Sequence, residues 1–207
     1  MLVRRFQVRK RNLERFNQAN FKIYHNQDFS VEDEQAYFEE DINSPDMYSY
    51  IEANKDLYRC FIFIPYMYGP TYNGSAVCMD KAILISCLHD ESYAYMTLLK
   101  KKMPEFKGII FLARPEMELA KRLYPFKDTK LAVLGGGVDT SWSEECSAQR
   151  FRKKFGINEK FILYAGRKDK GKKADELIEF FVQYKTLHKN NSIKLVLIGS
   201  DMLPIPS

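Results

Sequence analysis

The sequence predicts an α/β fold built on parallel sheets. Short, nearly continuous apolar runs alternate along the chain with segments of helical periodicity. Strands that are apolar throughout are typical of parallel sheets covered on both faces, because the connecting helices bury both sides. Of the 207 residues, 45% are hydrophobic and 29% are charged. This is the composition of an ordinary globular protein and excludes a disordered or fibrous chain.

The first part of the chain is predicted to be mainly helical. After a basic start, we expect a strand at Phe21–His25 and helices at Val31–Glu40 and Pro45–Asn54. Ser44 precedes Pro45, and a serine at the N-cap followed by proline at the first helical position is a strong start signal.

The rest of the chain alternates between strands and helices. We expect strands at Cys60–Pro65, Ala82–Cys87, Gly108–Ala113 and Lys130–Leu134, and helices at Tyr93–Met103 and Pro115–Leu123. The pattern breaks at Gly135–Gly137, which we interpret as the flexible start of an interdomain connection because no helix begins directly after it. It resumes with helix Ala148–Phe155, strand Phe161–Ala165, helix Ala174–His188 and strand Ile193–Ile198.

The turn between the strand ending at Ala165 and the helix beginning at Ala174 has the features of a phosphate site. Gly166 and Gly171 allow a backbone to approach an anion closely, and the following helix points its unpaired amides and positive dipole end to the same place. Arg167 adds a planar fork of donors and Lys172 a mobile charge.

The spacing of Arg167 and Lys172, followed by a helix, resembles the donor-diphosphate motif of the family-4 glycosyltransferases. Gly137-Val138-Asp139 and the basic segment that ends at Gly156 resemble the family's passage between its two domains. The resemblance implies a GT-B fold, with an N-terminal acceptor-side Rossmann-like domain over residues 1–138 and a C-terminal donor-binding Rossmann-like domain from residue 139 to 207. It also implies retaining transfer of a sugar from a nucleotide-diphosphate donor to an acceptor, with the diphosphate held by Gly166, Arg167, Gly171 and Lys172 and with no metal or other cofactor.

Two parts of the family pattern are missing. The Gly-rich loop after the first strand of the N-terminal domain does not occur, and neither does the later pair of glutamates eight positions apart. We therefore expect a partial glycosyltransferase with a truncated second domain, in which the isolated chain binds a donor with little or no turnover. The acceptor, whether saccharide, lipid-linked or protein, stays open.

Three other interpretations of the same turn are considered. Gly166–Lys173 matches seven positions of the G-x-x-x-x-G-K-[ST] phosphate loop, but Lys173 replaces the hydroxyl residue that binds magnesium. The chain could also be a non-catalytic nucleotide- or anion-binding module. Finally, the lysines could be merely solvated.

The N-terminal half offers two further candidate sites. His89 follows a predicted buried strand, and ligands bind at the carboxyl ends of strands in α/β sheets. The resemblance implies that a histidine here meets the sugar or diphosphate, so His89 is the catalytic candidate; alternatively, His89 and Asp90 cap the next helix. Tyr66, Tyr68 and Asn73 also follow a strand and could stack against the acceptor or form a packed loop.

Charge and cysteine content bear on location and partners. Basic residues in 1–15 and 150–173 flank an acidic stretch at 28–56. The first basic patch could contact nucleic acid or lipid phosphates or form a solvated helix face, and nucleic acid is disfavoured because aromatic residues are not interleaved with the arginines. The four separated cysteines favour free thiols over disulfides or a metal site. We expect a cytoplasmic protein, with peripheral membrane contact as an option.

Overall fold

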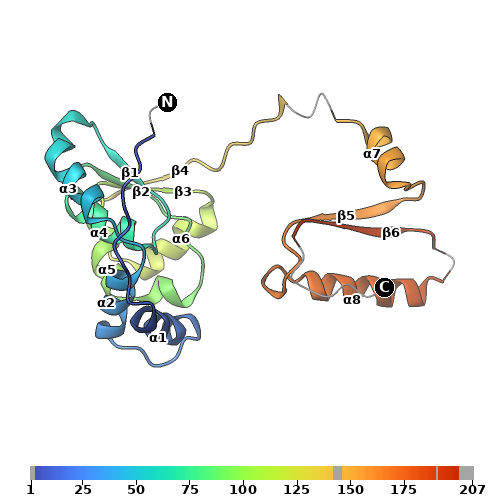
Figure 1. Cartoon of the computed structure of the whole chain (residues 1–207), viewed down its shortest axis with the longest axis horizontal. Coiled ribbons are helices and arrows are strands. Elements are labelled where there is room, and N and C mark those ends of the chain that lie inside the picture. Colours follow the sequence, from blue (N-terminus) through green and yellow to red (C-terminus); the bar gives the residue numbers. More distant parts are fainter. Residues whose placement is uncertain (1–2, 142–145, 190, 201–207) are drawn as a thin grey trace. The chain divides into compact units, whose positions relative to one another are not determined.

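The computed structural model describes residues 3–141, 146–189 and 191–200. The chain forms two compact units, Met1–Val138 (unit 1) and Asp139–Ser207 (unit 2). Each unit is mixed α/β and carries its own parallel sheet, as Figure 1 shows. The described residues contain no helix that is both long and apolar enough to cross a membrane.

Unit 1 is built on a four-stranded parallel sheet with the order β1-β2-β3-β4. Its strands are β1 (Phe61–Phe63), β2 (Ala82–Ile85), β3 (Gly108–Phe111) and β4 (Lys130–Val133). The register aligns Ile85 with Ile110 and Ile110 with Ala132, so these side chains share one face of the sheet. All four strands were predicted, and each is one to three residues shorter than its predicted run.

Unit 1 has six α-helices in the described part of the chain. They are α1 (Leu13–Tyr24), α2 (Val31–Glu40), α3 (Pro45–Asn54), α4 (Gly69–Ala76), α5 (Thr97–Lys102) and α6 (Arg114–Leu123), together with the 3-10 turns η1 (Lys55–Leu57), η2 (Met79–Lys81), η3 (Ser92–Tyr95) and η4 (Met103–Glu105). Their inward side chains form one core with the sheet. Its fully buried members include Phe38, Leu84, Met96, Leu99 and Phe111.

The helices of unit 1 cover only one face of its sheet, so the prediction of a sheet whose connecting helices cover both faces is wrong within unit 1. Leu84 is fully buried, whereas Ile62 and Ile64, which point to the other face, are 58% and 57% exposed. The strand order explains this. Because the strands follow one another in space as they do in sequence, right-handed crossovers place every connecting helix on the same side.

Two predicted elements in unit 1 differ from the structure. The strand expected at Phe21–His25 is wrong, because these residues belong to α1 and its C-cap. Asn12 starts that helix by accepting a hydrogen bond from the Arg15 amide at 3.1 Å, and Ala19 and Ile23 are buried one helical turn apart. The helix expected at Tyr93–Met103 is interrupted at Met96, whose ψ of 135° is incompatible with a helix.

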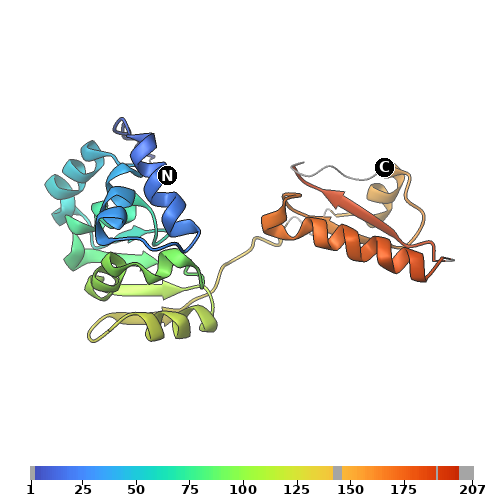
Figure 2. The ribbon, with the colours of Figure 1, turned by 90° about the horizontal axis from the view of Figure 1, so that it is seen from below.

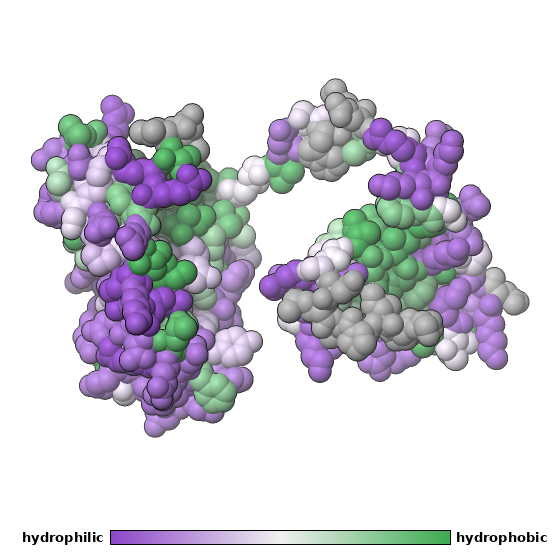
Figure 3. Space-filling view, viewed as in Figure 1, coloured by the Kyte–Doolittle hydropathy of each residue, from purple (hydrophilic) through white to green (hydrophobic). Residues whose placement is uncertain are grey.

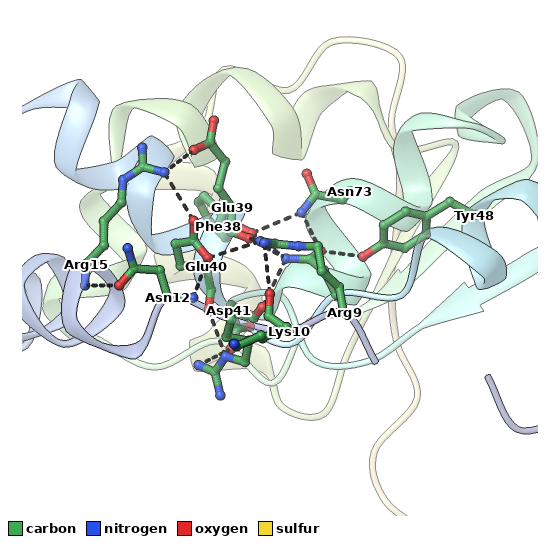
Figure 4. A network of polar contacts seen from close by, with 12 residues as sticks. Arg9, Lys10, Asn12, Arg15, Phe38, Glu39, Glu40, Asp41, Tyr48 and Asn73 are labelled. Atoms are coloured by element: carbon green, nitrogen blue, oxygen red, sulfur yellow. Dashed lines mark hydrogen bonds and ion pairs between the residues drawn. The ribbon is translucent and has the colours of Figure 1, made fainter. Parts of the chain in front are cut away.

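The N-terminal arginines pair with the acidic end of α2. In Figure 4, Arg9 and Arg15 reach Glu40 at 3.2 and 3.3 Å, and Arg15 also reaches Glu39 at 2.7 Å. Arg11 lies 3.7 Å from Asp41. The interpretation of this patch as a solvated helix face therefore needs correction, since three of its arginines neutralise the acidic stretch within the same unit.

Unit 2 is smaller and leaves most of its apolar surface exposed. It contains α7 (Ala148–Phe155), β5 (Phe161–Ala165), the 3-10 turn η6 (Lys170–Lys172), α8 (Ala174–Leu187) and β6 (Lys194–Ile198), with β5 and β6 paired in parallel. Among its described residues only Ile157, Lys168 and Ala174 are buried. Figure 3 shows hydrophobic surface between the strands and α8.

Candidate functional site

The basic turn begins where hydrogen bonds join two backbone segments of unit 2. The Gly166 amide donates to the Ile198 carbonyl at 2.9 Å and the Lys168 amide donates to the Ser200 carbonyl at 3.0 Å. Gly199 lies between these partners with φ +131°, and a Cβ on it would sit 1.9 Å from the Gly166 carbonyl oxygen. Glycine is therefore required at 199, and the parallel pairing continues past the ends of β5 and β6 into the turn.

Asp169 organises the middle of the turn. One carboxylate oxygen accepts the Lys172 amide at 2.8 Å and so caps η6, and the other lies 3.1 Å from Nε of Arg167. The guanidinium is thereby held beside the turn, although its side chain is 62% exposed. Asp169 was not among the residues predicted for this site, although aspartate is a preferred N-cap residue and this preference was an available signal.

The remaining lysines of the turn differ in their surroundings. Lys172 is exposed at the end of η6, whereas Lys168 is buried. Lys173 has left-handed backbone geometry with φ 54°, and its Nζ pairs with Glu176 at 2.6 Å, which raises the pKa of the lysine. The position that holds the metal-binding hydroxyl of a phosphate loop is thus occupied by a lysine engaged with α8. This arrangement counts against the phosphate-loop interpretation.

The first turn of α8 carries no side-chain cap at its N-terminus. Lys173 is the N-cap residue and makes no capping hydrogen bond, while Asp175 and Glu176 occupy the first turn. These acids offset part of the positive dipole end. Attraction of an anion to this turn therefore depends chiefly on the side chains of Arg167 and Lys172.

His89 lies at the carboxyl edge of the unit 1 sheet, on the loop between β2 and η3. The residue is exposed, and its carbonyl accepts the Glu91 amide at 3.0 Å. It does not cap the next helix: α5 starts after Met96, and the buried Glu34 accepts the amides of Thr97 and Leu98 at 2.8 and 2.7 Å. The capping interpretation of His89 and Asp90 is therefore wrong.

A cavity of about 660 Å³ adjoins the His89 loop. Three tyrosines, two carboxylates and two small polar residues line it: Tyr24, Asn26, Asp90, Glu91, Ser92, Tyr93 and Tyr95. Asp90 accepts from the Tyr95 hydroxyl at 2.7 Å, and burial raises the pKa of Tyr93 to about 12. Tyr93 is accordingly a neutral hydrogen-bonding group at physiological pH.

The three acceptor-side candidates have unequal exposure. Tyr66 is buried in the core and donates to Glu91 at 2.9 Å, so its ring cannot stack against an acceptor. Asn73 belongs to α4, and its amide donates to Asn43 Oδ1 at 2.7 Å and to the Phe38 carbonyl at 3.1 Å. Only Tyr68, which is 46% exposed, offers a free ring surface among the three.

Glu116 fills the carboxyl edge of the sheet and was not anticipated. One of its carboxylate oxygens accepts from Ser86 Oγ at 2.6 Å and from the Leu88 amide at 2.7 Å. The other accepts the Leu112 amide at 2.6 Å. Two of these partners lie 28 and 30 residues away in sequence, so no local pattern indicated the role. The carboxylate holds together the ends of β2 and β3.

The candidates fall into separate sets. Gly166, Arg167, Gly171 and Lys172 share the turn of unit 2, whereas Tyr66, Tyr68, Asn73 and His89 belong to unit 1. Within the described ranges, no group of three or more histidine, cysteine or acidic side chains is arranged to hold a metal ion. The four cysteines form no disulfide there.

Comparison with known proteins does not add to these observations. No protein-family model matches the sequence, and a search of the curated proteins finds no match.

Proposed function

We propose that the chain is a glycosyltransferase-like protein that binds the diphosphate of a nucleotide sugar at the turn Gly166–Lys173. The observation that carries the proposal is the arrangement of Arg167 and Lys172 on one short turn between a parallel strand and a 14-residue helix. Arg167 is held near the turn by Asp169, and its remaining guanidinium N–H groups are open to solvent. A guanidinium fork matches two phosphate oxygens, and Lys172 adds a second charge.

The chemistry proposed for this site is support of a leaving diphosphate. When the bond between the anomeric carbon and the phosphate oxygen breaks, negative charge grows on that oxygen. The oxygen of the acceptor hydroxyl forms the new bond to the anomeric carbon, and its proton passes to the leaving diphosphate. Arg167 and Lys172 would stabilise that growing charge without a metal. His89 is the catalytic candidate of unit 1, supported by its exposed imidazole at the carboxyl edge of the sheet.

A second function, non-catalytic binding of a nucleotide or another anion, is favoured by a specific observation. Two of the three acidic residues in the described turn and the first helical turn after it are already engaged, because Asp169 pairs with Arg167 and Glu176 pairs with Lys173. Turnover also needs groups that act in the transition state. We therefore expect binding to exceed catalysis in residues 1–207.

Calorimetry with uridine, guanosine and adenosine diphosphates tests the proposal. Because charge-assisted hydrogen bonds contribute about 1.5–3 kcal/mol each, Arg167→Ala should weaken binding by roughly tenfold or more. Lys170→Ala is the matched control. Lys170, like Lys172, is an exposed cation of η6, but it is not one of the two cations proposed to bind the diphosphate, Arg167 and Lys172. Unchanged affinity in Arg167→Ala, or no binding by the parent chain, would sink the assignment.

Inorganic pyrophosphate separates the two functions in the same instrument. Tighter binding of one nucleoside diphosphate than of pyrophosphate supports recognition of a nucleotide donor. Equal binding of pyrophosphate and of all three nucleoside diphosphates supports the anion-binding module.

A further inference from the structure

The uncovered face of the unit 1 sheet is apolar across β1, β2 and β3. Ile62, Ile83, Ile85 and Ile110 alternate with the core residues of their strands and therefore point away from the helices. None of the four is buried. Figures 1 and 2 show the helices of unit 1 gathered on the opposite side. Parallel sheets are normally covered by helices on both faces, so this face lacks its usual cover within unit 1.

A hollow lies at one end of this face. It has a volume of about 410 Å³ and its floor includes Ile83, Ile110 and Ala132. Gly108 lies between Ile83 of β2 and Lys130 of β4. Because it has no side chain, the hollow is deeper at this point. An apolar floor of this size accommodates aliphatic side chains of a partner.

Three cations border the hollow. Arg59, Lys107 and Lys130 are exposed and lie at the amino ends of β1, β3 and β4. None of them forms an ion pair with a carboxylate among residues 3–141, 146–189 and 191–200. The charge on this rim is therefore available to an acidic partner.

The charge and the topology together select one kind of occupant. A helix that covers a parallel sheet runs antiparallel to the strands in the usual crossover arrangement, which brings its C-terminus to the amino ends of the strands. There, the negative end of its dipole and any acidic side chains meet the three cations. A second copy of this face is disfavoured where the strands of the two copies run parallel, because such pairing would place two sets of cations together.

We propose that this face docks an amphipathic α-helix of a partner protein, with its apolar stripe on Ile83, Ile85 and Ile110 and with acidic residues at its C-terminal end near Arg59, Lys107 and Lys130. The proposal concerns unit 1 and is independent of the diphosphate turn.

Fluorescence anisotropy with synthetic helices tests this docking on the full chain. Three labelled peptides of about 18 residues share one apolar stripe, and they carry glutamates at the C-terminal end, lysines at that end, or a scrambled order. At low ionic strength the glutamate peptide should bind at least roughly tenfold tighter than the others. Ile110→Asn should weaken its binding by a similar factor. The double variant Lys107→Glu, Lys130→Glu should reverse the preference between the acidic and basic peptides.

Lys121→Glu is the matched control, because Lys121 is an exposed lysine on α6, on the covered side of the sheet. It should leave peptide binding unchanged, and circular dichroism should show that every variant keeps its helices. Failure of all three peptides to bind, or equal binding of the acidic and basic peptides, overturns the proposal. It is also overturned if Ile110→Asn abolishes a dimer of the parent chain in sedimentation, or if it abolishes binding to anionic vesicles, since the face would then serve a second copy or a lipid surface.

Discussion

Asp169 places a negative charge in the turn that contains Arg167 and Lys172. Its carboxylate caps η6 and pairs with Arg167, so it positions the guanidinium but also places a negative charge beside the proposed diphosphate. A second anion brought to the same turn is repelled by that carboxylate. Asp169 therefore orders the turn and also lowers the affinity of the turn for an anion.

Asp169→Asn should tighten the binding of nucleoside diphosphates. Asparagine keeps an oxygen that can accept the Lys172 amide, whereas the repulsion of the phosphates is lost. We expect an affinity roughly three to ten times higher, which calorimetry can measure. Glu179→Gln is the control, because it removes a charge from the second turn of α8. It should change the affinity little. Weaker binding in Asp169→Asn would mean that the cap matters more than the charge.

The sequence indicated the residues of the turn but not their contacts. Gly166, Arg167, Gly171 and Lys172 could be selected because strand, glycine, cation and helix follow one another locally. Glu116 could not be selected, since it binds residues 28 and 30 positions away. Tyr66 was selected for its aromatic ring, but burial is a property of the assembled core and is not visible in a single tyrosine.

At the scale of elements, the extended segment before α1 is fastened to the end of α2. Glu40 is the centre of this contact: one oxygen accepts the Asn12 amide at 2.9 Å, and the carboxylate pairs with Arg9 and Arg15. Those contacts lower the pKa of Glu40, with the Asn12 amide as the largest cause and the arginines adding to it. The segment thus depends on an ionised Glu40.

The stability of unit 1 should fall when Glu40 is protonated. A carboxyl group whose pKa is lower in the folded state stabilises the fold above its ordinary value of 4.5, and this stabilisation is lost as the pH falls through the folded pKa. At neutral pH, Glu40→Gln should lower the free energy of unfolding by about 1–3 kcal/mol, and the loss should shrink below the folded pKa.

Urea unfolding followed by circular dichroism at neutral and acidic pH measures this effect. Glu118→Gln, on the exposed surface of α6, is the control and should show no such pH dependence. If Glu40→Gln and the parent chain differ equally at both pH values, the carboxylate charge is not what fastens the segment.

Local signals located most elements, and tertiary context accounts for the exceptions. Helices α2 and α3 match their predicted bounds because Ser30 and Ser44 cap them through their own side chains. The segment Phe21–His25 alternates in polarity like a strand, yet the burial of Ala19 and Ile23 makes it helical. The open sheet face was not predicted, because strand order is set by long-range pairing.

At the scale of the whole molecule, the two units differ in how much core they bury. Unit 1 buries seven phenylalanine and tyrosine side chains, Phe38 and Phe111 among them, whereas unit 2 buries only Ile157, Lys168 and Ala174 among its described residues. Burial of apolar surface is the main term that stabilises a fold, and unit 2 buries little of it. The units should therefore open independently.

Hydrogen exchange on the full chain should show this difference. Amides of β2 and β3 should exchange roughly 100-fold more slowly than those of β5 and β6, because opening of unit 2 exposes little apolar surface. Mass spectrometry of peptides from each strand measures the rates. Equal protection of the two sheets would contradict the view that unit 2 lacks a closed core of its own.

The most direct test of the central claim is a titration of the isotope-labelled chain with uridine diphosphate, followed by amide chemical shifts. If the turn holds the diphosphate, the largest shift changes should fall on Gly166–Ala174, where the amides lie beside Arg167 and Lys172, and in Arg167→Ala they should require roughly tenfold more uridine diphosphate or more. Changes centred elsewhere, or an unchanged titration midpoint in Arg167→Ala, would contradict the assignment of this turn as the diphosphate site.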